Sequence, residues 1–141
     1  MSQTTMQQVI ITEPGGVDKL AYETVTIPEA KADEVLVKVH AFGINRPDIL
    51  QRQGLYPMPP GVTQVPGLEV AGEVVAVGAE VTQFKLGDKV CGLTNGGGYA
   101  EYCVVPQSLH FLEYVKFDFV ELHNTRHNHH HWSNYKLYHP I

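Results

Sequence analysis

The stretch Gly67-Leu68-Glu69-Val70-Ala71-Gly72-Glu73-Val74-Val75-Ala76-Val77-Gly78 decides the fold of this 141-residue chain. It is rich in β-branched residues, which favour strands. Its glycines stand where a strand must turn sharply or let another backbone approach closely. By itself the stretch predicts one long, bent and buried strand, and the sequence on both sides of it must supply the partners.

Short strands are expected on both sides of this stretch. Residues 34–42 show the clearest signal, because apolar residues alternate there with other side chains. The complete set of expected strands is 8–12, 20–27, 34–42, 68–77, 89–93 and 99–105. The turn Pro14-Gly15-Gly16 is expected to join the first two tightly, and the proline-rich residues 57–61 predict a surface loop. Five to seven short strands predict a compact, twisted barrel or sandwich.

One short helix is expected, from Asn45 or Arg46 through Arg52. Proline is tolerated in a first helical turn, and an acidic residue near the N-terminus, here Asp48, is favourable there. Gly54 lies just past the expected end. Asn45 is a suitable N-cap. Asp48 and Arg52 stand four residues apart and predict an exposed ion pair.

Composition and charge exclude several classes of protein. Apolar residues make up 43% and charged residues 18%, which fits a folded domain, and the net charge of -5 argues against nucleic-acid binding. No apolar run is long enough for a membrane helix, and residues 1–8 do not resemble a signal peptide. We therefore expect a cytoplasmic protein without membrane contacts. Cys91 and Cys103 predict two buried thiols rather than a disulfide framework or a zinc site.

The composition changes abruptly near residue 109. All 13 glycines precede this point, whereas seven of the eight histidines follow it. We expect a folded β domain over residues 1–109 and an atypical, poorly ordered tail rich in His and aromatic residues over 110–141. One hypothesis for the tail is an altered reading frame, an alternative exon or a gene fragment. The other is a binding tail, in which His127, His129, His130 and His131 hold a metal ion or contact a partner.

Four more motifs stand in order with the first stretch, and they are 41–48, 51–57, 86–90 and 96–102. Together the five motifs resemble the N-terminal domain of the medium-chain dehydrogenase/reductase superfamily, in particular its zinc-free quinone oxidoreductase branch, the zeta-crystallin-like enzymes. The resemblance covers residues 8 to about 108. It implies a mainly β fold, a GroES-like and partly open β-barrel with one or two short helices. In the family a Rossmann domain that binds NADPH follows, and we expect that domain to be absent from this chain.

The resemblance also bears on metal binding. In the zinc-dependent alcohol dehydrogenases a histidine stands at the position of Leu68, and a cysteine stands at the position of Asn45. Catalytic zinc takes three protein ligands with N, S or carboxylate donors, so neither leucine nor an asparagine amide is suited to the role. The four-cysteine lobe that holds structural zinc in those relatives is also missing. No zinc is expected in this domain.

Five candidate site residues follow from the resemblance. Asn45 and Tyr56 are expected to be catalytic and to contact the cofactor on its nicotinamide side, because an amide and a phenol can hold a polar ring edge without adding charge. Asp48, Gln51 and Glu69 are expected to line the cleft. Read from the residues alone, other roles stay open: Asn45 as a helix cap, Tyr56 packed beside Pro57, Gln51 facing water, and Glu69 as a buried carboxylate bound to backbone.

The expected function is the substrate-side half of an NADPH-dependent quinone oxidoreductase, in which a hydride passes from NADP(H) to a quinone without zinc. Because the nucleotide-binding half of the cleft is missing, we expect the chain to be inactive by itself. The face that would meet the second domain should stay exposed and lead to self-association. The alternative function is a non-enzymatic small β domain whose His-rich tail binds a metal or a partner.

Overall fold

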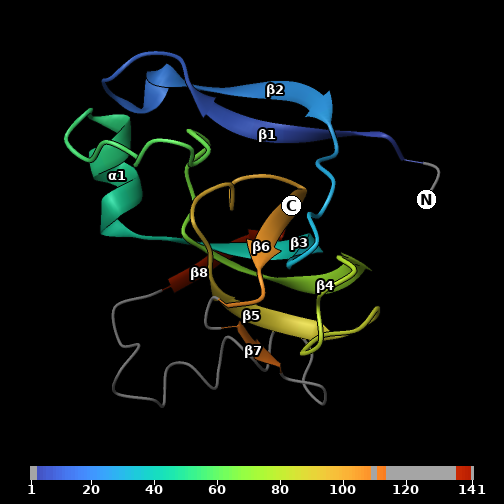
Figure 1. Cartoon of the computed structure of the whole chain (residues 1–141). Helices are drawn as coiled ribbons and strands as arrows, with labels where there is room; N and C mark the ends of the chain where they lie inside the picture. The colour runs from blue at the N-terminus through green and yellow to red at the C-terminus, as the bar shows by residue number, and fades with distance from the viewer. Residues whose placement is uncertain (1–2, 109–110, 114–135, 141) are drawn as a thin grey trace.

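The computed structural model describes residues 3–108, 111–113 and 136–140, and its ribbon is drawn in Figure 1. The strands are β1 (Thr5–Ile11), β2 (Leu20–Thr26), β3 (Glu34–Ile44), β4 (Glu69–Val77), β5 (Lys89–Leu93), β6 (Tyr102–Pro106), β7 (Phe111–Glu113) and β8 (Lys136–Pro140). The α-helix is α1 (Arg46–Arg52), and a single 3-10 turn, η1, covers Val17–Lys19. The expected mainly β fold with one or two short helices is confirmed.

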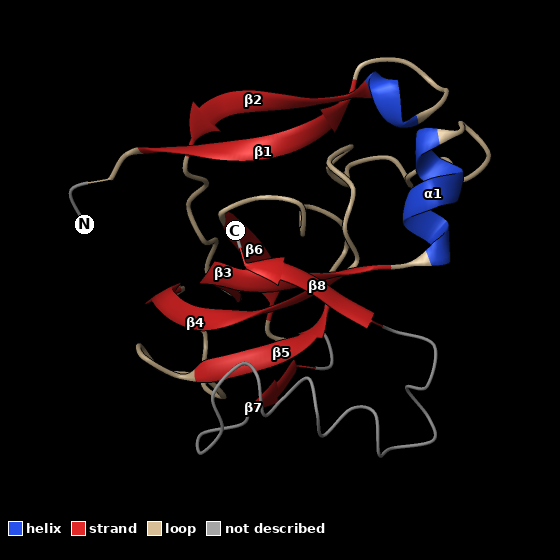
Figure 2. Ribbon diagram, turned by 180° about the vertical axis from the view of Figure 1, so that it is seen from behind, coloured by secondary structure: helices blue, strands red, loops and turns tan. Residues whose placement is uncertain are grey.

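The strands form two antiparallel groups. β1 and β2 make a two-stranded ribbon, and the larger sheet has the order β6-β3-β4-β5-β7, with β8 also paired to β3. Figures 1 and 2 show the ribbon as a separate layer beside the larger sheet, with α1 at one end of the molecule, and side chains of the two layers pack together. Every pairing is antiparallel, so the described part of the chain contains no Rossmann domain, whose sheet is parallel.

β3 is the central strand of the molecule. Its first half pairs with β4 on one side and with β6 on the other. The alternating valines predicted in this strand are buried in the main core, together with side chains from β4, β5 and β6. That core consists of Val35, Val37, Val39, Val70, Val74, Val90, Cys103 and Val105. The opposite face of β3 contributes Leu36 to a second cluster, which lies beneath the ribbon and includes Met6 and Tyr102.

The glycine in the middle of β4 is required by the close approach of β3. A Cβ atom on Gly72 would collide with the backbone carbonyl of Lys38 on the neighbouring strand. The β3–β4 register also shifts twice, between Leu36 and Val37 and between Val39 and Ala41, which bends the pair. The long, bent and buried strand predicted from residues 67–78 is confirmed.

Two local predictions were wrong. Pro14-Gly15-Gly16 does not form a tight turn, because the connection between β1 and β2 is longer and contains η1, and Gly15 N–H donates to Arg52 O at 2.9 Å. The exposed Asp48–Arg52 ion pair is also absent from the described contacts. Asp48 is buried, while Arg52 Nε donates to Gly15 O at 3.1 Å. The β1–β2 connection therefore packs against the end of α1 through Gly15 and Arg52, while Asp48 accepts hydrogen bonds from Asn45 N–H and the Tyr99 hydroxyl.

Two short pieces of the expected tail join the larger sheet. β7 pairs with β5, and β8 pairs with residues 41–44 of β3. The four clustered histidines lie outside the described residues, so the binding-tail hypothesis and the boundary at residue 109 stay predictions. Cys91 and Cys103 are both buried and free, as expected, and burial raises the pKa of each thiol to about 11.

No helix in the described ranges is both long enough and apolar enough to cross a lipid bilayer.

The central position of β3 can be tested with two valines. We expect Val37→Ala, at a side chain with 0% exposure, to lower the free energy of unfolding by about 2–3 kcal/mol, because it removes buried methyl groups and leaves a cavity. Val77→Ala, at a side chain 39% exposed near the end of β4, should cost about 0.5 kcal/mol or less. Urea denaturation followed by circular dichroism measures both. Equal losses would contradict the assignment of Val37 to the core.

Candidate active site

The candidate site begins where β3 passes into α1. Asn45 occupies the N-cap position in an extended conformation, with φ of -125° and ψ of 159°, and Pro47 lies in the first turn. Asp48 Oδ2 accepts a hydrogen bond from Asn45 N–H at 3.0 Å, which satisfies a backbone donor at the helix start. The predicted helix is therefore confirmed. The Asn45 side chain, however, lies against Glu69: its Nδ2 donates to Glu69 Oε2 at 3.3 Å.

Asn45, Asp48 and Glu69 form one buried polar cluster. Glu69, the first residue of β4, has 0% exposure, and Asn45 is only 6% exposed. Gly43 provides space for the Glu69 carboxylate, because a Cβ atom at this position would collide with it. Burying polar groups of this kind is costly unless they find partners, so the cluster constrains the geometry at the end of β3.

Tyr99 completes the cluster, although the sequence analysis did not identify it. Its hydroxyl donates to Asp48 Oδ2 at 2.8 Å, and its ring lies against Phe42 with the two centroids 4.5 Å apart. Gly67 packs directly on Tyr99: its φ is +105°, and a Cβ there would lie 2.6 Å from both the Tyr99 ring and its backbone nitrogen. The available signal was a lone tyrosine after three glycines, since a buried tyrosine needs a partner for its hydroxyl.

Burial sets the electrostatics of the Asp48–Tyr99 pair. It raises the pKa of Asp48, while the hydrogen bonds from Asn45 N–H and the Tyr99 hydroxyl, together with the backbone of Gly67, act in the opposite direction. Burial, followed by the neighbouring Asp48, also raises the pKa of Tyr99, so the phenol keeps its proton and remains the donor. Because the pKa of Asp48 is higher in the folded state, its contribution favours folding most at low pH. That contribution decreases as the pH rises from 3.8 through the folded pKa.

The cluster has hydrogen-bonding capacity left over. Asn45 Oδ1 is buried and has no hydrogen-bond partner among the residues described, and the same is true of Asp48 Oδ1. The Asn45 amide also carries a second N–H besides the one directed at Glu69. An uncharged polar group placed beside Asn45 could therefore both donate to it and accept from it.

The other two candidate residues lie outside this hydrogen-bonded cluster. Gln51 Nε2 donates to Gln64 O at 2.9 Å, which connects α1 to the loop before β4. Tyr56 follows α1 and is 41% exposed. The structure thus brings Asn45, Asp48 and Glu69 together but does not join Gln51 or Tyr56 to them by a described hydrogen bond. The assignment of all five residues to one cleft stays a prediction.

The donor set at this site does not fit catalytic zinc. Asn45 contributes an amide and Leu68 an alkyl chain, and the Asn45 amide is already hydrogen-bonded to the Glu69 carboxylate. Across the described ranges there is no group of three or more His, Cys, Asp or Glu side chains placed to hold a metal ion. The arrangement is suited instead to hydrogen bonding of a neutral polar group.

The Tyr99–Asp48 hydrogen bond can be tested by NMR titration. We expect Tyr99→Phe to raise the pKa of the Asp48 carboxyl further, because the variant loses a donor that stabilises the charged form. The pH range over which the Asp48 contribution to stability declines should move upward with it. Tyr102→Phe is the matched control, since its hydroxyl donates to Gln3 Oε1 instead. An unchanged Asp48 pKa in Tyr99→Phe would rule out the bond in solution.

Comparison with known proteins identifies the fold family. The protein-family model of the alcohol dehydrogenase GroES-like domain matches residues 31–114 of this chain. Quinone oxidoreductase of Sus scrofa is 40% identical over 121 residues, which are 84% of this chain and 37% of that protein. The synaptic vesicle membrane protein VAT-1 homolog of Danio rerio is 39% identical over 77% of this chain and 22% of its own length. The chain thus spans well under half of these relatives.

A solved structure agrees with this assignment. The quinone oxidoreductase of Pseudomonas syringae pv. Tomato DC3000 superposes with a TM-score of 0.72 and 33% identity, covering 80% of this chain and 34% of that one. The family match includes the end of β3, α1 and β4, which carry the buried polar cluster. The chain belongs to the family of alcohol dehydrogenase GroES-like domains, within the medium-chain dehydrogenase/reductase superfamily, and is similar to its quinone oxidoreductases.

Proposed function

We propose that this chain supplies the substrate-side half of the cleft of an NADPH-dependent quinone oxidoreductase that works without zinc. The observation that carries the proposal is the Asn45 side chain, which is almost fully buried and held by Glu69, yet keeps an unpartnered carbonyl oxygen. A buried acceptor without a partner is costly and is best explained by a group that it binds. The similarity to quinone oxidoreductases supports a quinone as that group.

Three candidate residues of this chain have defined parts in the proposed reaction. A nicotinamide cofactor, when bound, would supply the hydride that brings two electrons to the quinone, and water would supply the proton that completes the hydroquinone. Glu69 fixes the orientation of the Asn45 amide, so that its remaining N–H and carbonyl can hold the polar edge of a ring. The exposed Tyr56 hydroxyl can donate to the quinone oxygen on which negative charge develops.

The absence of zinc from the proposal follows from the donor set. Catalytic zinc takes three protein ligands with nitrogen, sulfur or carboxylate donors, and neither Asn45 nor Leu68 provides one. The described residues contain no group of three or more His, Cys, Asp or Glu side chains that could hold the metal. A quinone is a good hydride acceptor, so neutral hydrogen-bond donors can provide the stabilisation that a metal provides for a less reactive carbonyl. NADPH rather than NADH, and a cytoplasmic location, are parts of this proposal.

We propose further that the chain is inactive by itself. Its described strands contain no strand–glycine-rich turn–helix unit to hold a pyrophosphate, and its relatives are far longer. We propose that the nucleotide site is supplied by another domain or chain.

A graft onto the Sus scrofa relative tests the proposed function. Residues 1–108 would replace the matching region of that enzyme, and NADPH oxidation would be followed with a naphthoquinone. We expect turnover that a metal chelator does not change, and a 10- to 100-fold lower kcat/KM in Asn45→Ala, or roughly 1.4–2.7 kcal/mol of transition-state stabilisation. Gln53→Ala, at an exposed residue ending α1, should have no effect. The chain alone should give no turnover.

The same experiment has clear contrary outcomes. Equal loss of activity in Gln53→Ala and Asn45→Ala would show that the effect comes from folding. Full activity in Asn45→Ala would remove the amide from the mechanism, and loss of activity with the chelator would reinstate a metal. Turnover by the chain alone would contradict its proposed inactivity.

We propose that the isolated chain self-associates. Large apolar side chains are exposed around the end of α1 and the β1–β2 connection, among them Val17 and Leu55, which are 71% and 69% exposed. Apolar surface left exposed in this way favours association. Size-exclusion chromatography with light scattering should show species larger than 15.7 kDa at micromolar concentration. A single monodisperse monomer would contradict this proposal.

A further inference from the structure

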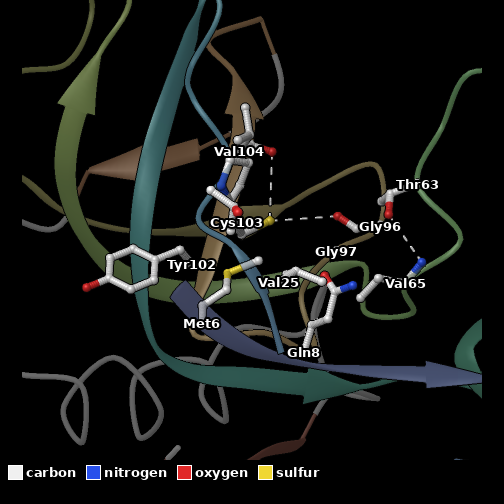
Figure 3. A pocket seen from close by; sticks show the side chains of 12 residues that line it. Met6, Gln8, Val25, Thr63, Val65, Gly96, Gly97, Tyr102, Cys103 and Val104 are labelled. Atoms are coloured by element: carbon white, nitrogen blue, oxygen red, sulfur yellow. Dashed lines mark hydrogen bonds between the residues drawn. The ribbon is translucent and has the colours of Figure 1, made fainter. Parts of the chain in front are cut away.

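A second candidate site lies between the β1–β2 ribbon and the body of the molecule. It is a pocket of about 330 Å³, shown in Figure 3. The ribbon forms one wall, the turn at 96–97 with the loop at 63–65 forms another, and β6 lies behind them. None of the five candidate site residues lines it.

The pocket has no ionic groups. None of its lining side chains is a carboxylate, an ammonium, a guanidinium or an imidazole, and most of them are apolar. The Cys103 thiol is held in place by contacts with Thr94 Oγ1 at 3.6 Å and Gly96 O at 3.7 Å. A charged ligand would lose its water here without gaining a counter-charge, so the lining favours a neutral molecule.

Two sulfur-containing side chains, Met6 and Cys103, line the pocket. Figure 3 shows the thioether of Met6 and the thiol of Cys103 facing the same space, one from the ribbon and one from β6. Sulfur is polarizable and makes favourable contacts with the edges of aromatic rings. Gln8 and Thr26 on the ribbon add polar groups to this apolar lining. Gln8 uses its Nε2 to donate to Glu23, which leaves its carbonyl oxygen available as an acceptor.

One wall of the pocket is already organised. Gly97 N–H donates to Val65 O at 2.9 Å, and Val65 N–H donates to Thr63 Oγ1 at 3.2 Å. Gly97 has φ of +83°, and a Cβ atom there would lie 3.5 Å from Thr63 and 3.6 Å from Cys103. A glycine at this turn therefore satisfies the backbone conformation and also keeps the space between these two side chains open.

We propose that this pocket binds a neutral, planar aromatic molecule of about two fused rings that carries one hydrogen-bonding substituent. An apolar cavity of about 150 Å³ in another protein holds a benzene ring, so a pocket of about 330 Å³ has room for a larger ring system. The proposal is independent of quinone reduction, because it uses none of the residues of the candidate active site.

The test uses 2-naphthol as the probe and 2-naphthoate as its charged counterpart. We expect 2-naphthol to shift the backbone amide signals of Val65, Gly97 and Cys103 saturably, with a Kd below about 1 mM, and 2-naphthoate to bind at least tenfold more weakly. Val25→Phe fills the pocket from the ribbon and should weaken 2-naphthol binding at least tenfold. Val9→Phe is the matched control, because Val9 is a half-buried valine of the same ribbon that does not line the pocket.

Other outcomes separate this proposal from the proposed function. Asn45→Ala should leave 2-naphthol binding unchanged, and shifts clustered around Asn45 instead would overturn the pocket assignment. Equal affinity for 2-naphthoate would overturn the inferred neutrality, and unchanged affinity in Val25→Phe would overturn the site itself. If Val25→Phe does not fold, Thr63→Phe fills the pocket from the exposed opposite wall and takes its place.

Discussion

The hydrogen bond from the Tyr99 hydroxyl to Asp48 Oδ2 connects the parts of the molecule that build the candidate site. Asp48 holds the start of α1 through Asn45 N–H, and Tyr99 carries the ring on which Phe42 and Gly67 pack. The backbone of Tyr99 also accepts a hydrogen bond from Val9 of the ribbon at 2.8 Å. Because both side chains are buried, loss of either partner would leave the other without this hydrogen bond. The resulting loss of free energy would destabilise the elements that pack against the pair.

The Asn45–Glu69 contact depends on this arrangement. Asn45 directly follows β3 and Glu69 begins β4, so their side chains meet where these two strands lie together. Asn45 contributes a neutral amide to this pair and Glu69 contributes an acidic side chain. The carbonyl oxygen of the Asn45 amide keeps no described hydrogen-bond partner. This donor set favours hydrogen bonding of a neutral polar group, as the proposed reduction of a quinone requires.

The segments 65–67 and 97–99 form a wall between the two candidate sites. Three backbone hydrogen bonds join them, from Gly97 to Val65, from Gly98 to Gly67 and from Tyr99 to Pro66. At one end of this wall Tyr99 hydrogen-bonds to Asp48 of the candidate active site, and at the other end Gly97 lines the pocket beside the ribbon. Gly67 and Gly98 let the two backbones approach so closely that a Cβ atom at either position would not fit.

The sequence by itself determined the features that depend on local pattern. Alternation predicted β3, glycine spacing predicted the bent β4, and Pro47 with Gly54 predicted α1, because each signal acts within a few residues of the chain. The sequence also showed that Asn45 and Leu68 are not residue types that bind catalytic zinc. Only the tertiary structure decided that Tyr99 binds Asp48, that Arg52 turns to Gly15, and that Met6 faces Cys103 across a pocket. These pairs lie 37 to 97 residues apart, and no local propensity specifies which distant partner a buried polar or apolar side chain will meet.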